Sequence, residues 1–358
     1  MAPVAGGWLT SDYSWRSVFY INVPVGALAF VGALIFLPES KVNSRFRLDW
    51  FGFGMLSLSV GALQLLLDRG SDQDWFTSRE IIVETVIAGL AFYLFLVHVF
   101  TTRRPFIRPA LFNDRNFTAG TLFITSVGVS SYAALSLQPP FLQELLNEPI
   151  VTAGLIMGPR GFGTIISMLV AGRLIGHVDN RIILFTGLAT TAWAFYAMSR
   201  WSLDVSNTSI MFVGVVQGLG QGMITVPLST LSLSTLAPDH RAEGSGVFNL
   251  ARTIGSSAGV SVVNSLFTHN VQVNHANIST YVTAFNRPLN ASHAAAYWSP
   301  FTDGGRAALD SVINQQAQVI AYNDDYKLLM WATLVTMPLL LLLRKPRQRT
   351  PDATVLAE

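Results

Sequence analysis

Nine stretches of the sequence are almost free of Asp, Glu, Lys and Arg, and each has about the length needed to cross a bilayer. A helix that spans the hydrocarbon core needs about 20 mostly apolar residues. The stretches lie at residues 17–37, 50–67, 81–100, 117–138, 149–171, 182–199, 206–228, 244–267 and 327–343. Residues 2–9 before them have the composition of the second half of a further helix. We therefore expect an all-α, polytopic membrane helix bundle with about nine complete spans and the end of a tenth.

The composition agrees with a membrane protein and excludes several other classes. Charged residues make up 12% of the chain, hydrophobic residues 51%, and the mean hydropathy is +0.43, whereas soluble domains carry about 25% charged residues. The net charge of +2 is too small and scattered to predict a nucleic-acid partner. The chain has no cysteine, so thiolate metal sites are excluded. Its histidines show no metal-ligand spacing, and we expect no metal site.

The basic residues predict the orientation of the spans. Fourteen of the 23 Lys and Arg residues lie in alternate gaps, at 38–49, 101–116, 172–181 and 229–243, and in the tail from 344. Short loops rich in Lys and Arg stay cytoplasmic, which predicts a multi-pass protein of the inner (plasma) membrane with a cytoplasmic C-terminus. Tryptophans near the predicted outer span ends fit an interfacial aromatic belt; they are Trp8, Trp75, Trp201 and Trp331.

One predicted outer segment, 268–326, is much longer than the other gaps. Its first part is polar and has no clear period, so we expect a loop there. Its last part, 307–322, has apolar residues at helical spacing. This pattern predicts an amphipathic helix that continues into the last span.

Four sequence motifs carry more specific information. Pro3, Gly6 and Gly7 lie in the first apolar segment, where proline bends a helix and small residues allow close helix approach. A second motif follows at fixed spacing and consists of Trp15, Arg16, Phe19, Asn22, Pro24 and Gly26. The third is the basic segment 172–181, GRLIGHVDNR. The fourth, at 315–324, combines QQA with AYND just before the last span.

Together these motifs resemble the major facilitator superfamily, in particular its fourteen-span drug–proton antiporter branch of the EmrB/QacA type and, within it, the EmrB-like subgroup. Pro3, Gly6 and Gly7 match the antiporter motif of that branch, although Ala2 replaces its leading glycine. The resemblance implies that 1–37 is the end of the N-terminal bundle, with parts of spans five and six. It also implies an N-terminally truncated chain.

The same resemblance assigns the rest of the chain. Residues 38–116 would be two extra linker spans with basic cytoplasmic loops, and 117–344 a C-terminal six-helix bundle that includes the long periplasmic loop 268–326. Residues 345–358 would be a cytoplasmic tail.

Polar residues within the predicted spans are candidates for substrate binding or coupling, because they are costly in a bilayer. Arg160 and Arg252 could hold a carboxylate or organise a gate; the alternative is that each joins helices through backbone carbonyls. Gln217 and Gln221 lie four residues apart on one helix face among glycines, and close helix packing explains them equally well. Asn249 precedes Arg252 by one turn and completes this set of candidates.

Other polar residues are predicted to have different roles. In the basic segment, the resemblance implies that Arg173, Asp179 and Arg181 form a cytoplasmic gate motif, with charge–helix-dipole contacts; simple topogenic charge is the alternative. Glu84 lies near an outer span end, where a solvated position is expected. Gln138, Gln143 and Glu144 are expected at the membrane interface. The family keeps a membrane-embedded acid in its first span, so the proton-carrying group is expected outside this chain.

The resemblance implies a proton-coupled multidrug efflux transporter, and a secondary active transporter rather than an enzyme. Its ligands would be amphipathic drug-like molecules and protons, and the proton gradient would drive transport without a cofactor. EmrB-like exporters work with a periplasmic adaptor and an outer-membrane channel, which are implied partners for a Gram-negative source. Two alternatives stay open: a truncated, transport-inactive fragment, and a solute importer of the same fold.

Overall fold

The computed structural model describes residues 2–12, 14, 16–36, 49–70, 73–103, 105–282, 298–299 and 301–344, apart from the side chains of 2–5, 11 and 238. The described elements are helical, which confirms the all-α prediction. The α-helices are α1 (Ala2–Asp12), α2 (Ser17–Tyr20), α3 (Asn22–Phe36), α4 (Trp50–Arg69), α5 (Arg79–Thr101), α6 (Arg115–Pro140), α7 (Ile150–Leu174), α8 (Asn180–Met198), α9 (Asn207–Ser234), α10 (Pro238–Tyr281) and α12 (Asp303–Thr336). The short elements are the 3-10 helices η1 (Trp75–Thr77), η2 (Pro109–Asn113) and η4 (Met337–Leu341), and the π-helix η3 (Phe141–Leu145).

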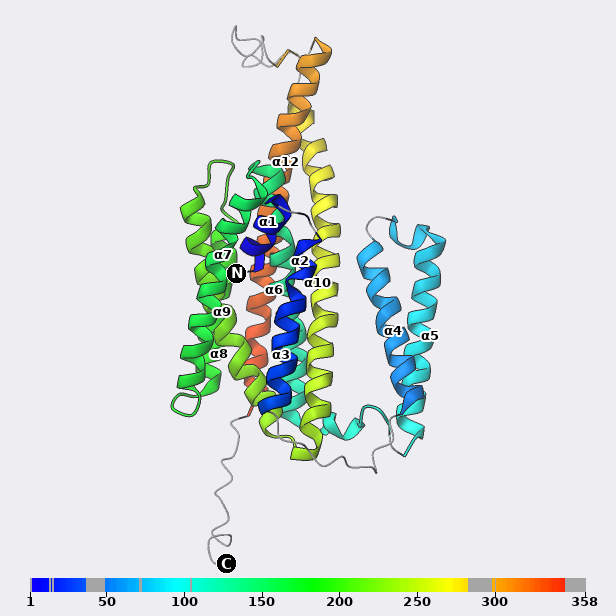
Figure 1. The fold of residues 1–358 in the computed structure, drawn as a ribbon. Helices are drawn as coiled ribbons and strands as arrows, with labels where there is room; N and C mark the ends of the chain where they lie inside the picture. Colours follow the sequence, from blue (N-terminus) through cyan, green and yellow to red (C-terminus); the bar gives the residue numbers. More distant parts are fainter. Residues whose placement is uncertain are drawn as a thin grey trace, which may run out of the picture.

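Seven helices of the described part are long and apolar enough to cross a membrane. They contain the first seven predicted spans, from Ser17–Phe36 to Asn207–Ser234. The eighth predicted span lies inside the longer α10, and the ninth begins in α12 and continues through η4. Figure 1 shows these two helices running the full height of the bundle beside α6 and α8.

Glycines set how closely the helices of the C-terminal half pack. A Cβ added at Gly128 of α6 would lie 2.6 Å from the Arg252 carbonyl oxygen of α10, and one at Gly222 of α9 would lie 2.7 Å from the Thr164 oxygen of α7. Such distances leave no room for a side chain, so backbone packs on backbone as in other membrane bundles. The pairs α6–α10 and α7–α9 are therefore closely joined.

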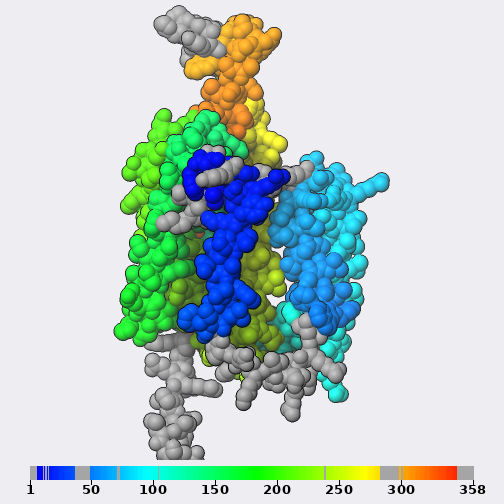
Figure 2. All heavy atoms as spheres, viewed as in Figure 1, coloured from blue at the N-terminus to red at the C-terminus, as the bar shows by residue number. Residues whose placement is uncertain are grey.

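The N-terminal elements lie on the outside of this bundle. Gly7 of α1 packs on the start of α7, where an added Cβ would lie 3.1 Å from the Ile150 carbonyl oxygen. Helices α2 and α3 contain no buried residue in the described structure. Figure 2 shows them as a dark blue column across the front face of the molecule. Their side chains are mostly apolar, so this surface suits lipid or another apolar helix.

Helices α4 and α5 form an antiparallel hairpin at the side of the bundle, next to α10 (Figure 1). Ser59 of α4 donates a hydrogen bond to the Ala88 oxygen of α5 (3.0 Å), and Ser257 of α10 donates one to Gln64 of α4. Glu84 of α5 is 9% exposed, and its Oε2 has no hydrogen-bond partner. The predicted solvated position for Glu84 was wrong, because the side chain is buried.

The predicted loop from residue 268 was wrong in its first part. Helix α10 continues without a break to Tyr281, and α12 begins at Asp303. The segment 268–281 contains neither glycine nor proline, so nothing in it interrupts a helix. His275 of α10 lies 2.9 Å from Asp310 of α12, which joins the two helices. The predicted helix at 307–322 is confirmed within α12, and the two helices project together beyond the bundle (Figure 1).

We call the opposite end of the bundle, where α6 begins and α12 leads to Arg344, the basic end. Asn116 and Arg344 exchange two backbone–side-chain hydrogen bonds there, at 2.9 and 2.7 Å. Thr235 donates to the Asp114 carboxylate (2.9 Å), which also caps α6. These contacts join α6, α9 and the end of the described chain at the basic end.

Candidate functional site

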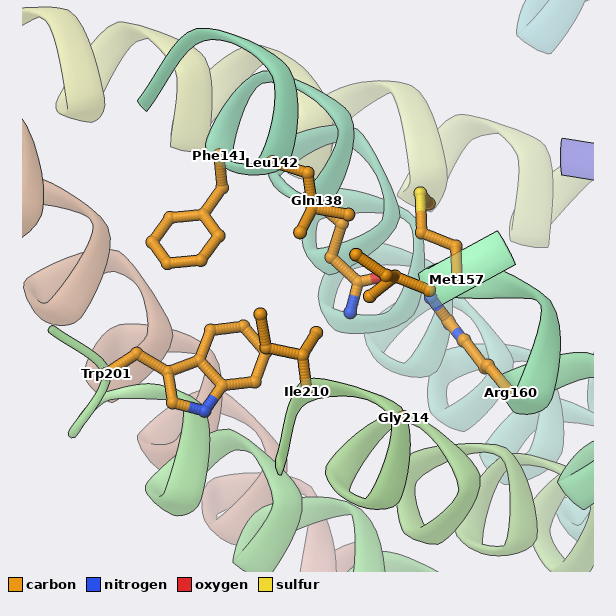
Figure 3. A pocket seen from close by; sticks show the side chains of 9 residues that line it. Gln138, Phe141, Leu142, Met157, Arg160, Trp201, Ile210 and Gly214 are labelled. Carbon is orange, nitrogen blue, oxygen red and sulfur yellow. The ribbon is translucent and has the colours of Figure 1, made fainter. Parts of the chain in front are cut away.

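A small pocket inside the C-terminal half contains one of the predicted arginines. It lies between α6, α7 and α9, and its walls are mainly apolar. The lining residues are Gln138, Phe141, Leu142, Ile156, Met157, Arg160, Trp201, Ile210 and Gly214. Figure 3 shows Phe141 and Trp201 on one side of this pocket and Arg160 on the other, with Gln138 between them. The residues enclose about 10 Å³, room for about one water molecule and far below the usual 300–1,000 Å³ of small-molecule sites.

The sequence at the end of α6 shapes one wall of the pocket. Pro139 and Pro140 end the regular helix, and the π-helix Phe141–Leu145 follows. Proline cannot donate the hydrogen bond of a regular helix, and π-helical turns are frequent at functional sites. Here the change of helix type turns Phe141 into the interior, where its ring lies 5.3 Å from that of Trp201.

Arg160 supplies the positive charge of the pocket. The residue is half-buried as a whole, but its Nη1 atom is shielded from solvent and has no hydrogen-bond partner. Gly214 and Gly218 of α9 lie against Arg160 and leave space for its backbone and Cβ. Tyr326 and Tyr132 lie within electrostatic range of the guanidinium. An unpaired donor of this kind favours a ligand with an acceptor or a negative charge.

A second pocket lies further toward the basic end and brings two more candidates together. Arg252 of α10 and Gln221 of α9 both line it, with Ser131 and Tyr132 of α6. Ser131 donates a hydrogen bond to the Gln221 Oε1 atom (2.6 Å). Tyr132 lines this second pocket and is also within electrostatic range of Arg160, which lines the first pocket. The two pockets are therefore neighbours along α6.

The remaining two candidates of this set lie outside both pockets. Gln217 is 1% exposed, and neither atom of its amide group has a hydrogen-bond partner. Asn249 is exposed and donates a hydrogen bond to the Ser245 oxygen of its own helix (3.0 Å). The structure thus joins Gln221 with Arg252, buries Gln217, and places Asn249 on the surface.

The basic segment 172–181 forms a tight turn between α7 and α8. Gly176 has a positive φ of 94°, a conformation that glycine adopts easily. Asp179 caps α8 and accepts a hydrogen bond from the Arg181 backbone nitrogen (3.1 Å), so its negative charge lies at a helix N-terminus. Arg173 is exposed, while Arg181 Nε is shielded and has no hydrogen-bond partner. The role of this motif as a gate stays a prediction.

The residues of the antiporter motif lie in α1. The Gly6 oxygen accepts a hydrogen bond from Thr10 (2.7 Å), and Gly7 is buried against the backbone of α7. Pro3 belongs to the same helix, but its side chain lies outside the described structure. The small residue at position 7 thus joins α1 to the C-terminal half.

Several residues of the first pocket lie in places that the sequence did not predict. Gln138 was predicted at the membrane interface, yet it is 5% exposed and lines the pocket. Trp201 was predicted in an outer aromatic belt, and it is also 5% exposed. Tyr132 and Tyr326 were not predicted as site residues. Their nearness to Arg160 depends on how the helices pack, and local sequence gives no signal for that. Among the described residues no group of three His, Cys, Asp or Glu side chains could hold a metal ion.

A bundle of long apolar helices defines the class of the protein as a multi-pass membrane protein. The sequence model of the Major Facilitator Superfamily matches residues 1–260, and the chain therefore belongs to this superfamily. The predicted resemblance to its EmrB-like members is confirmed by the relatives that follow.

Two curated relatives match almost the whole chain. The multidrug export protein EmrB of Escherichia coli (strain K12) is 28% identical over 347 residues, which is 96% of this chain and 68% of EmrB. The fatty acid resistance protein FarB of Neisseria gonorrhoeae is 28% identical over 349 residues, which is 97% of this chain and 69% of FarB. Among solved structures, a bacterial homolog of the human lysosomal transporter Spinster, in an inward-facing and occupied conformation, has a TM-score of 0.48. It is 15% identical and covers 83% of this chain and 68% of its own.

Proposed function

We propose that the protein is a proton-driven exporter of amphipathic, drug-like small molecules in the inner membrane. The observation that carries this proposal is the similarity to EmrB, a multidrug export protein, over 96% of the chain. Alternating access would open the helix bundle to one side of the membrane at a time. A periplasmic adaptor and an outer-membrane channel are proposed partners, with the projecting ends of α10 and α12 as a docking surface. The proton gradient, rather than a cofactor, would supply the energy.

The first pocket supports a preference among substrates. The pocket encloses about 10 Å³ in this structure, so alternating access would have to widen it for a substrate. Its apolar walls, Phe141, Leu142 and Trp201, would then suit a hydrophobic body, while Arg160 and Gln138 offer polar contacts. Such pockets accept varied apolar ligands and fix their orientation through a few polar groups. A carboxylate would satisfy the unpaired Nη1 atom of Arg160. We therefore include amphipathic carboxylates among the proposed substrates.

Transport in membrane vesicles tests the proposed function. In inside-out vesicles that contain the protein, an imposed proton gradient should drive a fluorescent lipophilic dye into the lumen, and an uncoupler should abolish the accumulation. Vesicles without the protein are the control. Proton-driven accumulation in right-side-out vesicles would instead identify an importer. Absence of transport in both orientations would favour the transport-inactive alternative.

The role of Arg160 is tested by binding, independently of transport. Octanoate and octanol have the same chain length, and only octanoate carries a carboxylate. A hydrogen bond to a charged group contributes about 1.5–3 kcal/mol, so Arg160→Gln should weaken octanoate binding about tenfold or more. Octanol binding should change little. Arg200→Gln is the control, because Arg200 is exposed. Equal octanoate affinity in the Arg160→Gln variant and the unaltered protein would show that Arg160 only joins helices.

A further inference from the structure

Two consecutive side chains of α12, Asp325 and Tyr326, are buried polar groups that lie outside the pocket of Arg160. Asp325 is 1% exposed and Tyr326 is fully buried. The Asp325 Oδ2 atom and the Tyr326 hydroxyl oxygen are both shielded from solvent and have no hydrogen-bond partner. A buried carboxylate is costly in its ionised form unless it is paired or hydrogen-bonded. Two adjacent buried polar groups without partners therefore point to a chemical role for this position in α12.

The surroundings of Asp325 close one end of the bundle. Its neighbours along the interior face of α12, Tyr322 and Leu329, are 3% and 1% exposed. The Tyr322 ring lies 5.2 Å from Phe141 and 4.4 Å from Phe267. We call this region the Trp201 end, because the Tyr326 ring lies 5.8 Å from Trp201 and Asn323 donates a hydrogen bond to the Trp201 oxygen (3.1 Å).

The charges nearest to Asp325 on its own helix do not neutralise an ionised carboxylate. Asp324 is within electrostatic reach of Asp325 and carries the same charge. Lys327 pairs with Asp324 at 3.0 Å, on the exposed side of α12. Glu144, from η3, acts on Tyr322 together with Asp325. The like charges and the burial both favour the neutral carboxylic acid.

The other elements packed around α12 add no direct partner for Asp325. From α7, Arg160 acts on Tyr326, and from α6, Tyr132 acts on Arg160. The nearby titratable groups at the end of α8 and on α10, Arg200 and His269, are exposed. Within the described structure, Tyr326 is therefore within electrostatic range of both Asp325 and Arg160.

We propose that Asp325 is a proton-binding carboxylate of the transporter, and that its neutral form keeps the Trp201 end closed. The inference rests on the proposed function, because a proton-driven exporter needs groups that bind and release protons. The proton comes from water at the Trp201 end and returns to water after the conformational change; only the carboxyl O–H bond forms and breaks.

The direction of this effect fits antiport. A proton that binds to Asp325 from the outer side removes its charge and allows the acid to be buried, which favours closure of the Trp201 end. Loss of the proton toward the other side restores the charge, and burial then becomes unfavourable. The Trp201 end would open again as the substrate is carried outward. The closed packing of Tyr322, Phe141 and Trp201 in this structure corresponds to the neutral acid.

Infrared spectroscopy of the purified protein in lipid vesicles tests the protonation state directly. A neutral carboxyl group gives a C=O stretching band that a carboxylate lacks. At neutral pH this band should be weaker in Asp325→Asn than in the unaltered protein. Asp204→Asn is the control and should leave the band unchanged, because Asp204 is exposed in the loop between α8 and α9. Equal bands in Asp325→Asn and the unaltered protein would overturn the proposal.

Cysteine labelling tests the closure. The chain has no natural cysteine, so Leu142→Cys would report on the closed pocket, where Leu142 is 1% exposed. Its labelling rate is divided by that of the exposed Ser202→Cys, which corrects for the pH dependence of an exposed thiol, and the Asp325→Asn background controls for ionisation of the buried thiol. The ratio should rise about tenfold between about pH 6 and about pH 9 when Asp325 is present. It should stay low in the Asp325→Asn background and keep its rise in the Asp204→Asn background.

The two measurements also separate this inference from the proposed function. Neither requires transport, so they give an answer even if the vesicles accumulate no dye. A labelling ratio that rises equally with and without Asp325 would overturn the proposed closure. Asp325→Glu keeps the carboxyl group, so it should retain the infrared band at a shifted frequency; a missing band in Asp325→Glu would contradict the assignment without relying on the asparagine variant.

Discussion

A partly shielded guanidinium such as that of Arg160 is informative because a protein rarely keeps a charge in an apolar interior without a use for it. Its shielded Nη1 atom has no hydrogen-bond partner, and the side chains nearest to it in the pocket are largely apolar. Substitution of one member of a buried polar set often costs more than the set contributes, because the other members are left unpaired. Effects of Arg160 variants are therefore best read by ligand binding, with folding checked separately.

A different polar cluster surrounds Asp49, the residue that precedes α4, and it allows a prediction of how stability depends on pH. Burial raises the pKa of Asp49, but its hydrogen bonds with the Gly52 nitrogen, His98 and the Phe106 nitrogen together outweigh burial, so the pKa lies below its ordinary value of 3.8. His98 Nε2 lies 2.9 Å from the carboxylate, and Asp49 also caps α4. A carboxylate with a lowered pKa stabilises the fold above its unfolded pKa and loses this effect as the pH falls through its folded pKa.

Asp49→Ala should therefore destabilise the start of α4 at neutral pH by about 0.5–2 kcal/mol, the usual cost of losing such a cap. Hydrogen exchange of the first turn of α4 measures the effect. The difference from the unaltered protein should shrink as the pH falls below about 3.8, since the natural carboxylate then becomes protonated. Asp204→Ala, in an exposed loop, is the control. A constant difference down to strongly acidic pH would contradict the role of the ionised carboxylate.

At the scale of elements, the glycines of α9 decide how closely α7 and α9 approach. Gly222→Ala would place a Cβ 2.7 Å from the Thr164 oxygen and 2.9 Å from the Met168 nitrogen. Both atoms belong to the backbone of α7, so the two helices would have to separate. Overpacking of this kind typically costs about 1–3 kcal/mol, more than the roughly 1 kcal/mol that alanine gains over glycine in helix propensity.

Thermal unfolding of the purified protein in detergent measures this effect. Gly222→Ala should lower the unfolding temperature. Gly172→Ala is the matched control, because an added Cβ there meets no atom within 4 Å and helix propensity alone acts. If both variants unfold at the same temperature as the unaltered protein, the close packing of α7 and α9 does not limit stability.

The sequence predicted most elements, and the exceptions have physical causes. Apolar length alone located α5 and α9, because a span leaves a continuous signal. It missed the end of α10, since the polar side chains of 268–281 give no period although they are compatible with a helix. It also missed Gln138, Trp201 and Asp325 as interior residues. Each lies near the end of an apolar stretch, where sequence does not distinguish a side chain that faces lipid or water from one that faces another helix.

On the scale of the whole molecule, the charge pattern predicts which end of the bundle faces the cytoplasm. The basic end carries the turn at 172–181, and the Trp201 end carries the loop between α8 and α9. The absence of natural cysteine makes single-cysteine variants unambiguous. Ser202→Cys and His177→Cys are suitable, because both residues are exposed and lie at opposite ends of α8.

A membrane-impermeant maleimide should label Ser202→Cys in intact cells. It should label His177→Cys only after the membrane is permeabilised, since excess Lys and Arg predicts a cytoplasmic basic end. The cysteine-free protein gives the background. The reverse labelling pattern would place the C-terminus outside and would also reverse the direction of proton entry proposed for Asp325.

The α4–α5 hairpin has a consequence for how the protein fits its lipid. Helix α4 has 20 residues and α9 has 28, which correspond to lengths of about 30 and 42 Å. A bilayer core of about 30 Å matches the hairpin without strain, whereas beside α9 the lipid must thicken or the helix must tilt. Lipids with longer or shorter acyl chains would therefore act unequally on the two sides of the molecule. Membrane thickness thus becomes a variable that could shift how readily the bundle moves against its hairpin.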